Sequence, residues 1–228
     1  MATAEISLDS IEFNFNQARL AAPKSKIMAV VKADAYGHGA VKVAQRLQTA
    51  DAFAVARLSE AVELRQAGIQ QPITLLSGVF HASQAQLAAD YDIDLVIHDE
   101  SQLELLKGQS HRVWLKLDTG MHRLGIEPKA LPLFLNTVAE SRLLGLMSHF
   151  SDADQPSHPK NAHQLEKLLA LTDSIEAPLS MANSAAIFRL PQAHFDIIRP
   201  GIALYGASPF ADISASELGL KPVMHLTS

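Results

Sequence analysis

A single lysine, Lys32, ends an otherwise apolar run in the stretch "AVVKADAYGHGA", residues 29–40. The apolar and β-branched neighbours predict a buried strand, so the amine is expected to be partly desolvated. Desolvation favours the neutral amine, which is the form that makes a Schiff base with a carbonyl group. Tyr36 adds a hydroxyl group four residues later. The alternative for Lys32 is an ordinary surface lysine whose amine reaches solvent at the rim of the fold.

Two later segments indicate anion-binding chemistry. Ser184 opens the helical pattern "SAAIF", and Gly201 and Ile202 follow an apolar run that begins at Ile197. Backbone N–H groups at such positions, together with a helix N-terminus, bind phosphate. The plainer alternative is that Gly201 permits a turn and Ser184 caps a helix. A Schiff-base lysine together with a phosphate pocket is the outline of a pyridoxal phosphate site.

Eight short apolar runs, separated by amphipathic segments, are the elements that must position these residues. The runs begin at Ile27, Phe53, Ile73, Leu95, Val113, Leu143, Pro178 and Ile197. Strands that are apolar throughout are buried on both faces, which is typical of parallel sheets covered by helices. Eight such units, in a chain close to the roughly 250 residues of a (β/α)8 barrel, predict that fold. A doubly wound sheet is the rival, but "GHGAVK" lacks the third glycine of its fingerprint.

Helix signals lie between the runs. The first helix is expected to bury Leu8, Ile11, Phe15 and Ala18, with Ser7 or Asp9 as its N-cap. Later helices are expected over "LSEAVELRQAG", ending at Gly68, over "DESQLELLKG", with Asp99 as N-cap, Gln102 in a capping box and Gly108 as its stop, and over "NAHQLEKLLALTDS".

The predicted fold class is α/β, a (β/α)8 TIM barrel over residues 1–220. Residues 221–228 belong to "LGLKPVMHLTS", which begins as a new strand and stops without a turn or a cap. We expect this segment to be the truncated start of a C-terminal β-domain. In such a barrel the active site lies at the C-terminal ends of the strands. Besides the residues already named, these ends carry Lys116, Arg123, His149, Asn183 and Arg199.

Composition and charge exclude several classes of function. The net charge is −5 without a long basic run, which argues against nucleic-acid binding, and no cysteine is present for disulfides or thiolate metal sites. The absence of a leader-like N-terminus and of a bilayer-length apolar run predicts a cytoplasmic protein that does not bind membranes. Five possible metal ligands lie close together in the sequence: His149, Asp152, Asp154, His158 and His163. We expect a polar loop here and not a metal site, because prolines interrupt the stretch and the i, i+4 spacing of ligands on a helix is missing before His158.

Five stretches resemble bacterial alanine racemase, a fold-type III pyridoxal phosphate enzyme. They are "AVVKADAYGHGA", "WLKLDTGMHRLGI", "SHFSDAD", "MANSAAIF" and "FDIIRPGIALYG", in the family's order and over nearly the whole chain. The resemblance implies an isomerase that interconverts L- and D-alanine, supplies D-alanine for the peptidoglycan of the cell wall and works as a homodimer. The alternative is a non-catalytic, single-barrel pyridoxal phosphate carrier, which is not expected to contain "DTGMHRLG" or "RPGIALYG".

The resemblance also implies roles for the matching residues. Lys32 would bind the cofactor covalently and act as the base on one face of the substrate, and Arg199 would face the pyridine nitrogen. Because arginine stays protonated, that nitrogen accepts a hydrogen bond and remains unprotonated, which weakens the ring as an electron sink and favours racemisation. The other implied roles are phosphate contacts for Tyr36, Ser184, Gly201 and Ile202, cofactor contact for Asn183, ring stacking and catalysis for His149, donation to the cofactor's phenolic oxygen and catalysis for Arg123, and carbamylation for Lys116.

The chain departs from the family's pattern in the matter of the second catalytic base. In alanine racemases that base is a tyrosine of the C-terminal β-domain, supplied across the dimer interface, and this sequence stops about where that domain starts. A smaller departure is Asp34, where asparagine is also common, and we expect little consequence from it.

The 228-residue chain is therefore predicted to bind pyridoxal phosphate and to racemise alanine little or not at all. Added cofactor should produce an absorption band near the edge of the visible range, and Lys32→Ala should abolish that band. A barrel aldolase that uses Lys32 without a cofactor would produce no band. Racemase activity near that of a full-length enzyme would contradict the need for a second domain.

Overall fold

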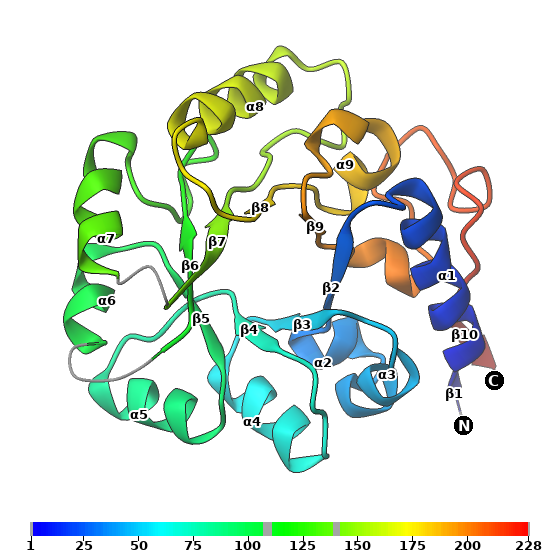
Figure 1. Cartoon of the computed structure of the whole chain (residues 1–228). Helices are drawn as coiled ribbons and strands as arrows, with labels where there is room; N and C mark the ends of the chain where they lie inside the picture. The colour runs from blue at the N-terminus through cyan, green and yellow to red at the C-terminus, as the bar shows by residue number, and fades with distance from the viewer. Residues whose placement is uncertain (1, 107–110, 139–141, 228) are drawn as a thin grey trace.

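Eight parallel strands form one sheet with helices on its outer side (Figure 1). The computed structural model describes residues 2–106, 111–138 and 142–227. The order of the strands is β8-β7-β6-β5-β4-β3-β2-β9. The predicted (β/α)8 barrel is confirmed. The strands are β2 (Lys26–Val30), β3 (Ala52–Val55), β4 (Ile73–Leu75), β5 (Asp94–Ile97), β6 (Val113–Lys116), β7 (Leu143–Met147), β8 (Leu179–Ser180) and β9 (Ile197–Ile198).

Contacts between the first and the last barrel strands close the sheet. β2 pairs in parallel with β9, so the two ends of the chain meet in the barrel wall. β9 also lies against β8, where the backbone N–H of Asp196 donates to the carbonyl of Leu179 at 3.2 Å and that of Arg199 to Ala182 at 2.9 Å. The strand that begins at Ile197 therefore adjoins the strand that leads to Lys32.

Helices cover the barrel between successive strands. They are α1 (Leu8–Ala21), α2 (Lys32–Gly37), α3 (Ala40–Arg46), α4 (Leu58–Gln66), α5 (Ala82–Asp90), α6 (Glu100–Leu105), α7 (Leu131–Thr137), α8 (Pro159–Thr172) and α9 (Ser184–Arg189), with short 3-10 turns at Pro128–Ala130, Pro191–Ala193 and Ile202–Tyr205. In the described residues, no helix combines the length and apolarity needed to cross a membrane.

Local signals place most helix boundaries correctly. Ser7, and not Asp9, caps α1, because the Ser7 hydroxyl accepts from the backbone N–H of Ser10 at 3.2 Å. Asp99 caps α6 as predicted, and Gln102 completes the capping box. α4 ends at Gln66, and Gly68 adopts a left-handed conformation, with φ of +85°, two residues later. The predicted stop of α6 at Gly108 lies outside the described residues.

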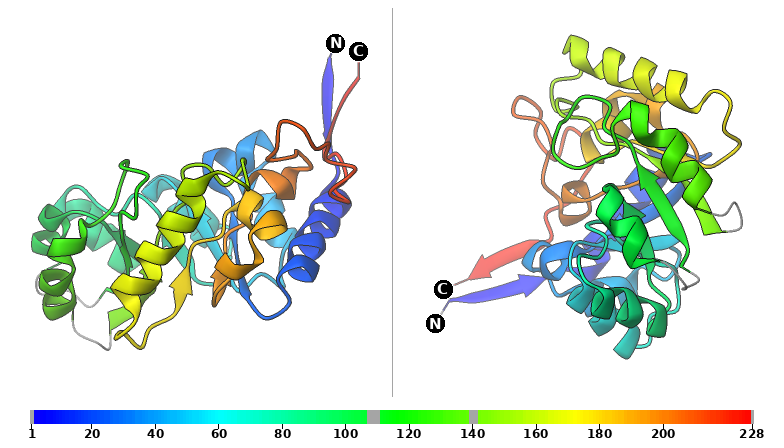
Figure 2. Two further views of the ribbon diagram at one scale, coloured as in Figure 1. Left: turned by 90° about the horizontal axis from the view of Figure 1, so that it is seen from above. Right: turned by 90° about the vertical axis from the view of Figure 1, so that its left-hand side faces the viewer.

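A two-stranded antiparallel ribbon projects from the barrel (Figure 2). It joins β1 (Thr3–Ile6) to β10 (Met224–Thr227), which lies inside the strand expected after residue 220. The sequence did not predict β1. Its four residues have no apolar alternation and are mostly exposed, so the pairing with β10 is what defines the strand.

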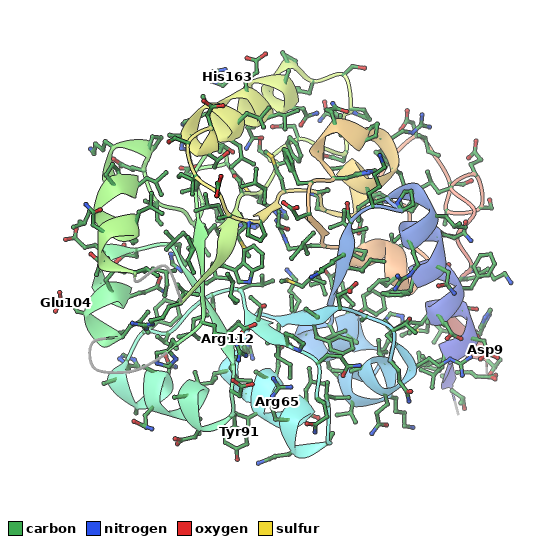
Figure 3. The ribbon with its side chains drawn as sticks, viewed as in Figure 1. Asp9, Arg65, Tyr91, Glu104, Arg112 and His163 are labelled. Carbon is green, nitrogen blue, oxygen red and sulfur yellow. The ribbon has the colours of Figure 1, made fainter. Side chains whose placement is uncertain are left out.

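Two arginines, Arg65 and Arg112, connect the loops at the N-terminal edge of the barrel (both are labelled in Figure 3). The guanidinium of Arg65 donates to backbone carbonyls of the loops before β4 and β5 at 2.7–3.0 Å. Arg112 pairs with Asp92 at 2.9 Å and with the buried carboxylate of Asp94 at 2.7 Å. Polar contacts with a structural role connect the loops at this edge. The residues that could take part in catalysis or ligand binding lie at the opposite edge.

Asn14 of α1 ties the start of the chain to its end. Its buried amide nitrogen donates to the carbonyls of Leu204, at 3.1 Å, and Lys221, at 2.8 Å, and its oxygen accepts from the Lys221 N–H at 2.7 Å. All of these hydrogen bonds link segments that are far apart in sequence. The side chain therefore fastens α1, the last 3-10 turn and the segment that leads to β10.

Asn14→Asp is expected to lower the free energy of unfolding by about 2–4 kcal/mol, because a carboxylate cannot donate to two buried carbonyls. Urea denaturation measures the change. Asn16→Asp, on the exposed side of the same helix, is the matched control and should stay within about 0.5 kcal/mol of the parent. Equal effects of the two substitutions would contradict the role given to Asn14.

Candidate functional site

A cavity of about 490 Å³ opens at the C-terminal ends of the barrel strands. This volume lies in the range of small-molecule sites. All ten residues predicted for catalysis, cofactor binding or carbamylation line it, from both ends of the chain and from the middle. They are Lys32, Tyr36, Lys116, Arg123, His149, Asn183, Ser184, Arg199, Gly201 and Ile202.

Lys32 lies two residues beyond β2, at the start of an unusual turn. Ala33, Asp34, Ala35 and Tyr36 all have left-handed backbone angles, with φ of 51–55°. We call residues 33–36 the left-handed turn; it makes up most of α2. A left-handed conformation costs roughly 1–2 kcal/mol for each non-glycine residue, so the surrounding contacts must hold it in place.

Side chains from outside and inside the left-handed turn hold its backbone. One oxygen of Glu60, on α4, accepts from the N–H of Ala33 at 2.8 Å, and the other accepts from Ala56 and Arg57 at 2.9 and 3.0 Å. The carboxylate of Asp34 accepts from the N–H of Ala40 at 2.7 Å and so starts α3. Glu60 therefore connects the backbone beside Lys32 to the end of the neighbouring strand β3.

Tyr205 supports the same turn from below. Its ring packs at 4.8 Å from the rings of both Tyr36 and His38, and its buried hydroxyl donates to the carbonyl of Val30 at 2.8 Å. Burial raises the pKa of both tyrosines. The two phenol groups are therefore neutral hydrogen-bonding groups, and Tyr36 is the one that lines the cavity.

Backbone N–H groups gather beside Tyr36 at the predicted phosphate position. The Ser184 hydroxyl accepts from the N–H of Gly201 at 2.9 Å and from that of Ala203 at 3.3 Å. A Cβ on Gly201 would come within 2.8 Å of the Tyr36 hydroxyl, so glycine keeps this corner open. The alternative reading of Ser184 as a helix cap is wrong, because the Asn183 side chain caps α9 by accepting from Ala186 at 3.1 Å.

Arg199 crosses the floor of the cavity and is buried. Its terminal nitrogens donate to the Ser180 hydroxyl and to the Ser148 carbonyl, and one lies 3.4 Å from Nδ1 of His149. Among the described residues, these contacts use only the terminal nitrogens, so Nε of Arg199 has no hydrogen-bond partner and the guanidinium has no carboxylate partner. The cavity therefore offers a fixed cationic N–H to a ligand atom that can accept.

Four cationic side chains surround the cavity and change the titration of two neighbours. Burial, followed by the charges of Arg199, Arg123 and Lys32, lowers the pKa of Lys116 to about 8. Burial holds the pKa of His149 well below its usual value, and the charges of all four cationic side chains, now including Lys116, act in the same direction. His149 is therefore a neutral imidazole at pH 7, and the field of the cavity favours an anionic ligand.

Arg123 reaches the cavity from a loop that Asp118 folds. The Asp118 carboxylate accepts from the backbone N–H groups of Gly120 and His122 at 2.9 and 3.1 Å. These hydrogen bonds favour the ionised carboxylate and lower the pKa of Asp118. The Arg123 side chain is exposed and, in the part of the chain that the structure describes, makes no ion pair. It is thus free to meet a ligand or a new negative charge on Lys116.

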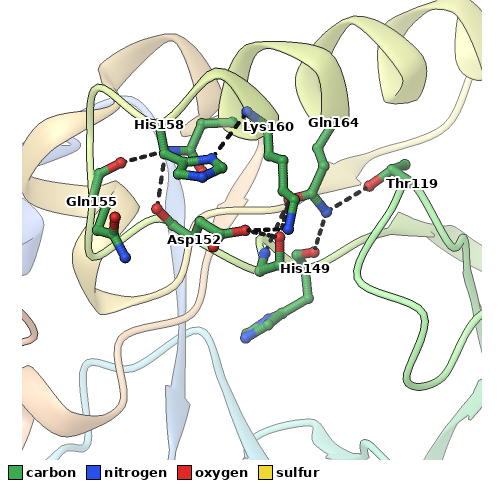
Figure 4. Close-up of polar contacts among 9 residues, drawn as sticks. Thr119, His149, Asp152, Gln155, His158, Lys160 and Gln164 are labelled. Carbon is green, nitrogen blue, oxygen red and sulfur yellow. Dashed lines mark hydrogen bonds and ion pairs between the residues drawn. The ribbon is translucent and has the colours of Figure 1, made fainter.

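The loop from His149 to His158 packs against α8 (Figure 4). Asp152 lies 3.7 Å from the ammonium of Lys160, and Nδ1 of His158 accepts from the Lys160 N–H at 3.3 Å. His163 lies on the outer side of α8 (Figure 3). No group of three possible metal ligands converges among the residues that the structure describes.

Residues 6–209 match the family model described as "Alanine racemase, N-terminal domain". The chain belongs to the alanine racemase N-terminal domain family. The family predicted from five sequence stretches is therefore confirmed. Solved structures agree with it: the biosynthetic alanine racemase of Pseudomonas aeruginosa superposes with a TM-score of 0.94 and 45% identity over 99% of this chain and 65% of that one.

Alanine racemases from other bacteria are similar along the whole of this chain. The chain is 43% identical to the enzyme of Vibrio atlanticus (strain LGP32) over 235 residues, which cover 100% of this chain and 66% of that protein. It is 47% identical to the "Alanine racemase, biosynthetic" of Pseudomonas aeruginosa, over 98% of this chain and 64% of that protein. This chain thus spans 64–66% of the length of these two alanine racemases.

Glu60→Gln is expected to lower the free energy of unfolding by about 1–2 kcal/mol, because three N–H groups need two accepting oxygens and an amide supplies one. Glu63→Gln, an exposed position on the same helix, is the matched control and should change it by less than about 0.5 kcal/mol. Urea denaturation measures both. If Glu60→Gln behaves like its control, the left-handed turn does not depend on this carboxylate.

Proposed function

We propose that the chain is the cofactor-binding part of an alanine racemase and binds pyridoxal 5'-phosphate covalently through Lys32. The observation that carries the proposal is the convergence, on one cavity, of an amine, a group of backbone N–H donors and the buried guanidinium of Arg199, which has no carboxylate partner among the described residues. The donor set fits this cofactor. It offers an amine for the aldehyde carbon, N–H and hydroxyl groups for the phosphate, and Arg199 for the ring nitrogen.

Each part of the cavity would hold one part of the cofactor. Gly201, Ile202, Ser184 and the hydroxyl of Tyr36 would bind the phosphate, because the N–H groups there are oriented by neighbouring helical turns. Asn183, which caps α9, lines the same corner. The positive field of the four cationic side chains would add to phosphate affinity.

Bound pyridoxal phosphate supplies an electron-withdrawing ring that stabilises negative charge at the α-carbon of an amino acid. The Lys32 amine would take the α-proton on one face of the substrate. Nε of Arg199 would donate to the ring nitrogen and keep it unprotonated, which limits the electron sink and favours return of the proton. The imidazole of His149, neutral beside Arg199, would lie along the ring.

The whole racemase would need a group on the other face of the substrate. Strand β10 is exposed and is the first strand after the barrel strands, so we propose that residues from 221 onward lead into a C-terminal β-domain. That domain would supply the second base across a homodimer interface. The complete protein would then interconvert L- and D-alanine and provide D-alanine for peptidoglycan.

The proposal is tested by comparing pyridoxal phosphate with pyridoxal, which lacks the phosphate. The parent chain should bind the phosphorylated form more tightly by at least about tenfold, and Ser184→Ala should narrow that gap. Borohydride reduction and peptide mapping should place the covalent adduct on Lys32. Equal affinity for the two aldehydes, or an adduct that survives in Lys32→Ala, would overturn the proposal.

Lys116 is expected to carry a carbamate in bicarbonate-containing buffer. The neutral amine adds carbon dioxide and releases a proton, and a pKa of about 8 makes the neutral form available near pH 8, where an ordinary lysine is protonated. The new carboxylate would pair with Arg123. With ¹³C-labelled bicarbonate, a carbamate resonance should strengthen as the pH rises through 8. It should vanish in Lys116→Met and persist in the exposed control Lys42→Met.

A further inference from the structure

We infer that Gln164, on α8, is a positioning residue that fixes the peptide segment between Ser148 and Ser151 and thereby sets the places of His149 and Arg199 for the cofactor. This inference rests on the proposed function for its use of the cofactor. The underlying geometry is independent of the cofactor. Sequence reasoning gave Gln164 no role, because a glutamine in an amphipathic helix usually belongs to its solvated face.

The amide of Gln164 is buried, with 1% of the residue exposed, and every part of it is used. Its oxygen accepts from the backbone N–H of Ser151 at 3.0 Å and lies 3.1 Å from the Ser151 hydroxyl oxygen, which donates its proton to the carboxylate of Asp152. Its nitrogen donates to the carbonyl of His149 at 3.0 Å and lies 3.4 Å from the hydroxyl oxygen of Thr119 (Figure 4). One side chain therefore holds the backbone on both sides of residue 150.

The same segment continues directly to Arg199. The carbonyl of Ser148 accepts from Arg199, and the Ser148 hydroxyl donates to the carbonyl of Leu117 at 2.9 Å. Thr119 contacts that hydroxyl at 2.8 Å. The hydrogen bonds run from Gln164 through Thr119 and Ser148 to the guanidinium. They join the loops after β6 and β7 to the arginine that follows β9.

Only an amide satisfies this arrangement. Glutamate would keep the acceptor for Ser151 and lose the donor to the His149 carbonyl, which would then face a carboxylate oxygen. Methionine has a similar length and makes neither bond. A buried carbonyl or N–H without its partner has a cost of roughly 1–3 kcal/mol, so the loop is expected to shift and admit water to the imidazole.

The experiment uses the 228-residue chain with Gln164→Met and Gln164→Glu. Gln155→Met is the matched control, since Gln155 is an exposed glutamine of the same loop. NMR of ¹⁵N-labelled histidine, with His149→Gln for assignment, follows the His149 titration without cofactor. Pyridoxal phosphate affinity is measured on the same samples, and urea denaturation verifies that each variant is folded.

In the parent and in Gln155→Met, His149 should remain neutral to well below pH 6.5. In both Gln164 variants its titration should move toward the ordinary value as water reaches the ring, and cofactor affinity should fall by about tenfold. An unchanged His149 titration in a folded variant would overturn the inference. A shifted His149 titration with unchanged cofactor affinity would overturn the link between Gln164 and the cofactor. If the parent chain does not bind the cofactor, the proposed function is overturned, and the NMR titration alone decides the role of Gln164.

Discussion

The backbone pairing of β2 with β9 is the interaction on which the arrangement of the site depends. It brings Lys32, near the start of the chain, beside the Gly201 corner near its end. Without barrel closure the amine and the N–H cradle would lie at opposite edges of an open sheet. Backbone hydrogen bonds extend the short strands on both sides of β9: Lys26 and Val30 donate to the carbonyls of Asp196 and Pro200 on the β2 side, and Asp196 and Arg199 donate to Leu179 and Ala182 on the β8 side.

Closure alone does not orient Lys32. The left-handed turn that follows it places the Tyr36 hydroxyl beside Gly201. Such a backbone persists only where its surroundings over-determine it. Glu60, Asp34 and Tyr205 supply these surroundings from three different elements. The strained turn and its supports therefore form one unit, in which local backbone cost is offset by contacts that also set the position of the cofactor-binding residues.

The sequence predicts the barrel and the cavity residues well because both follow from simple patterns. Eight apolar runs mark the strands, and polar residues at their ends are conspicuous against apolar neighbours, as with Lys32. Gln164 and Glu60 were missed because a polar residue on an amphipathic helix has the same pattern whether it faces solvent or an N–H group. The left-handed turn was missed because Ala33 and Ala35 favour ordinary helix. Strand β1 was missed because its partner is at the other end of the chain.

The same long-range pairings set an order of events during synthesis on the ribosome. The strands from β2 to β8 can pair one after another as they emerge, each with a neighbour close in sequence. The wall of the barrel stays open at β2 until β9 appears, and β1 waits longer still for β10. During that interval β2 has an unpaired edge, and its apolar side chains, which the closed barrel buries, are exposed. A strand in this state is especially prone to pair with another nascent chain.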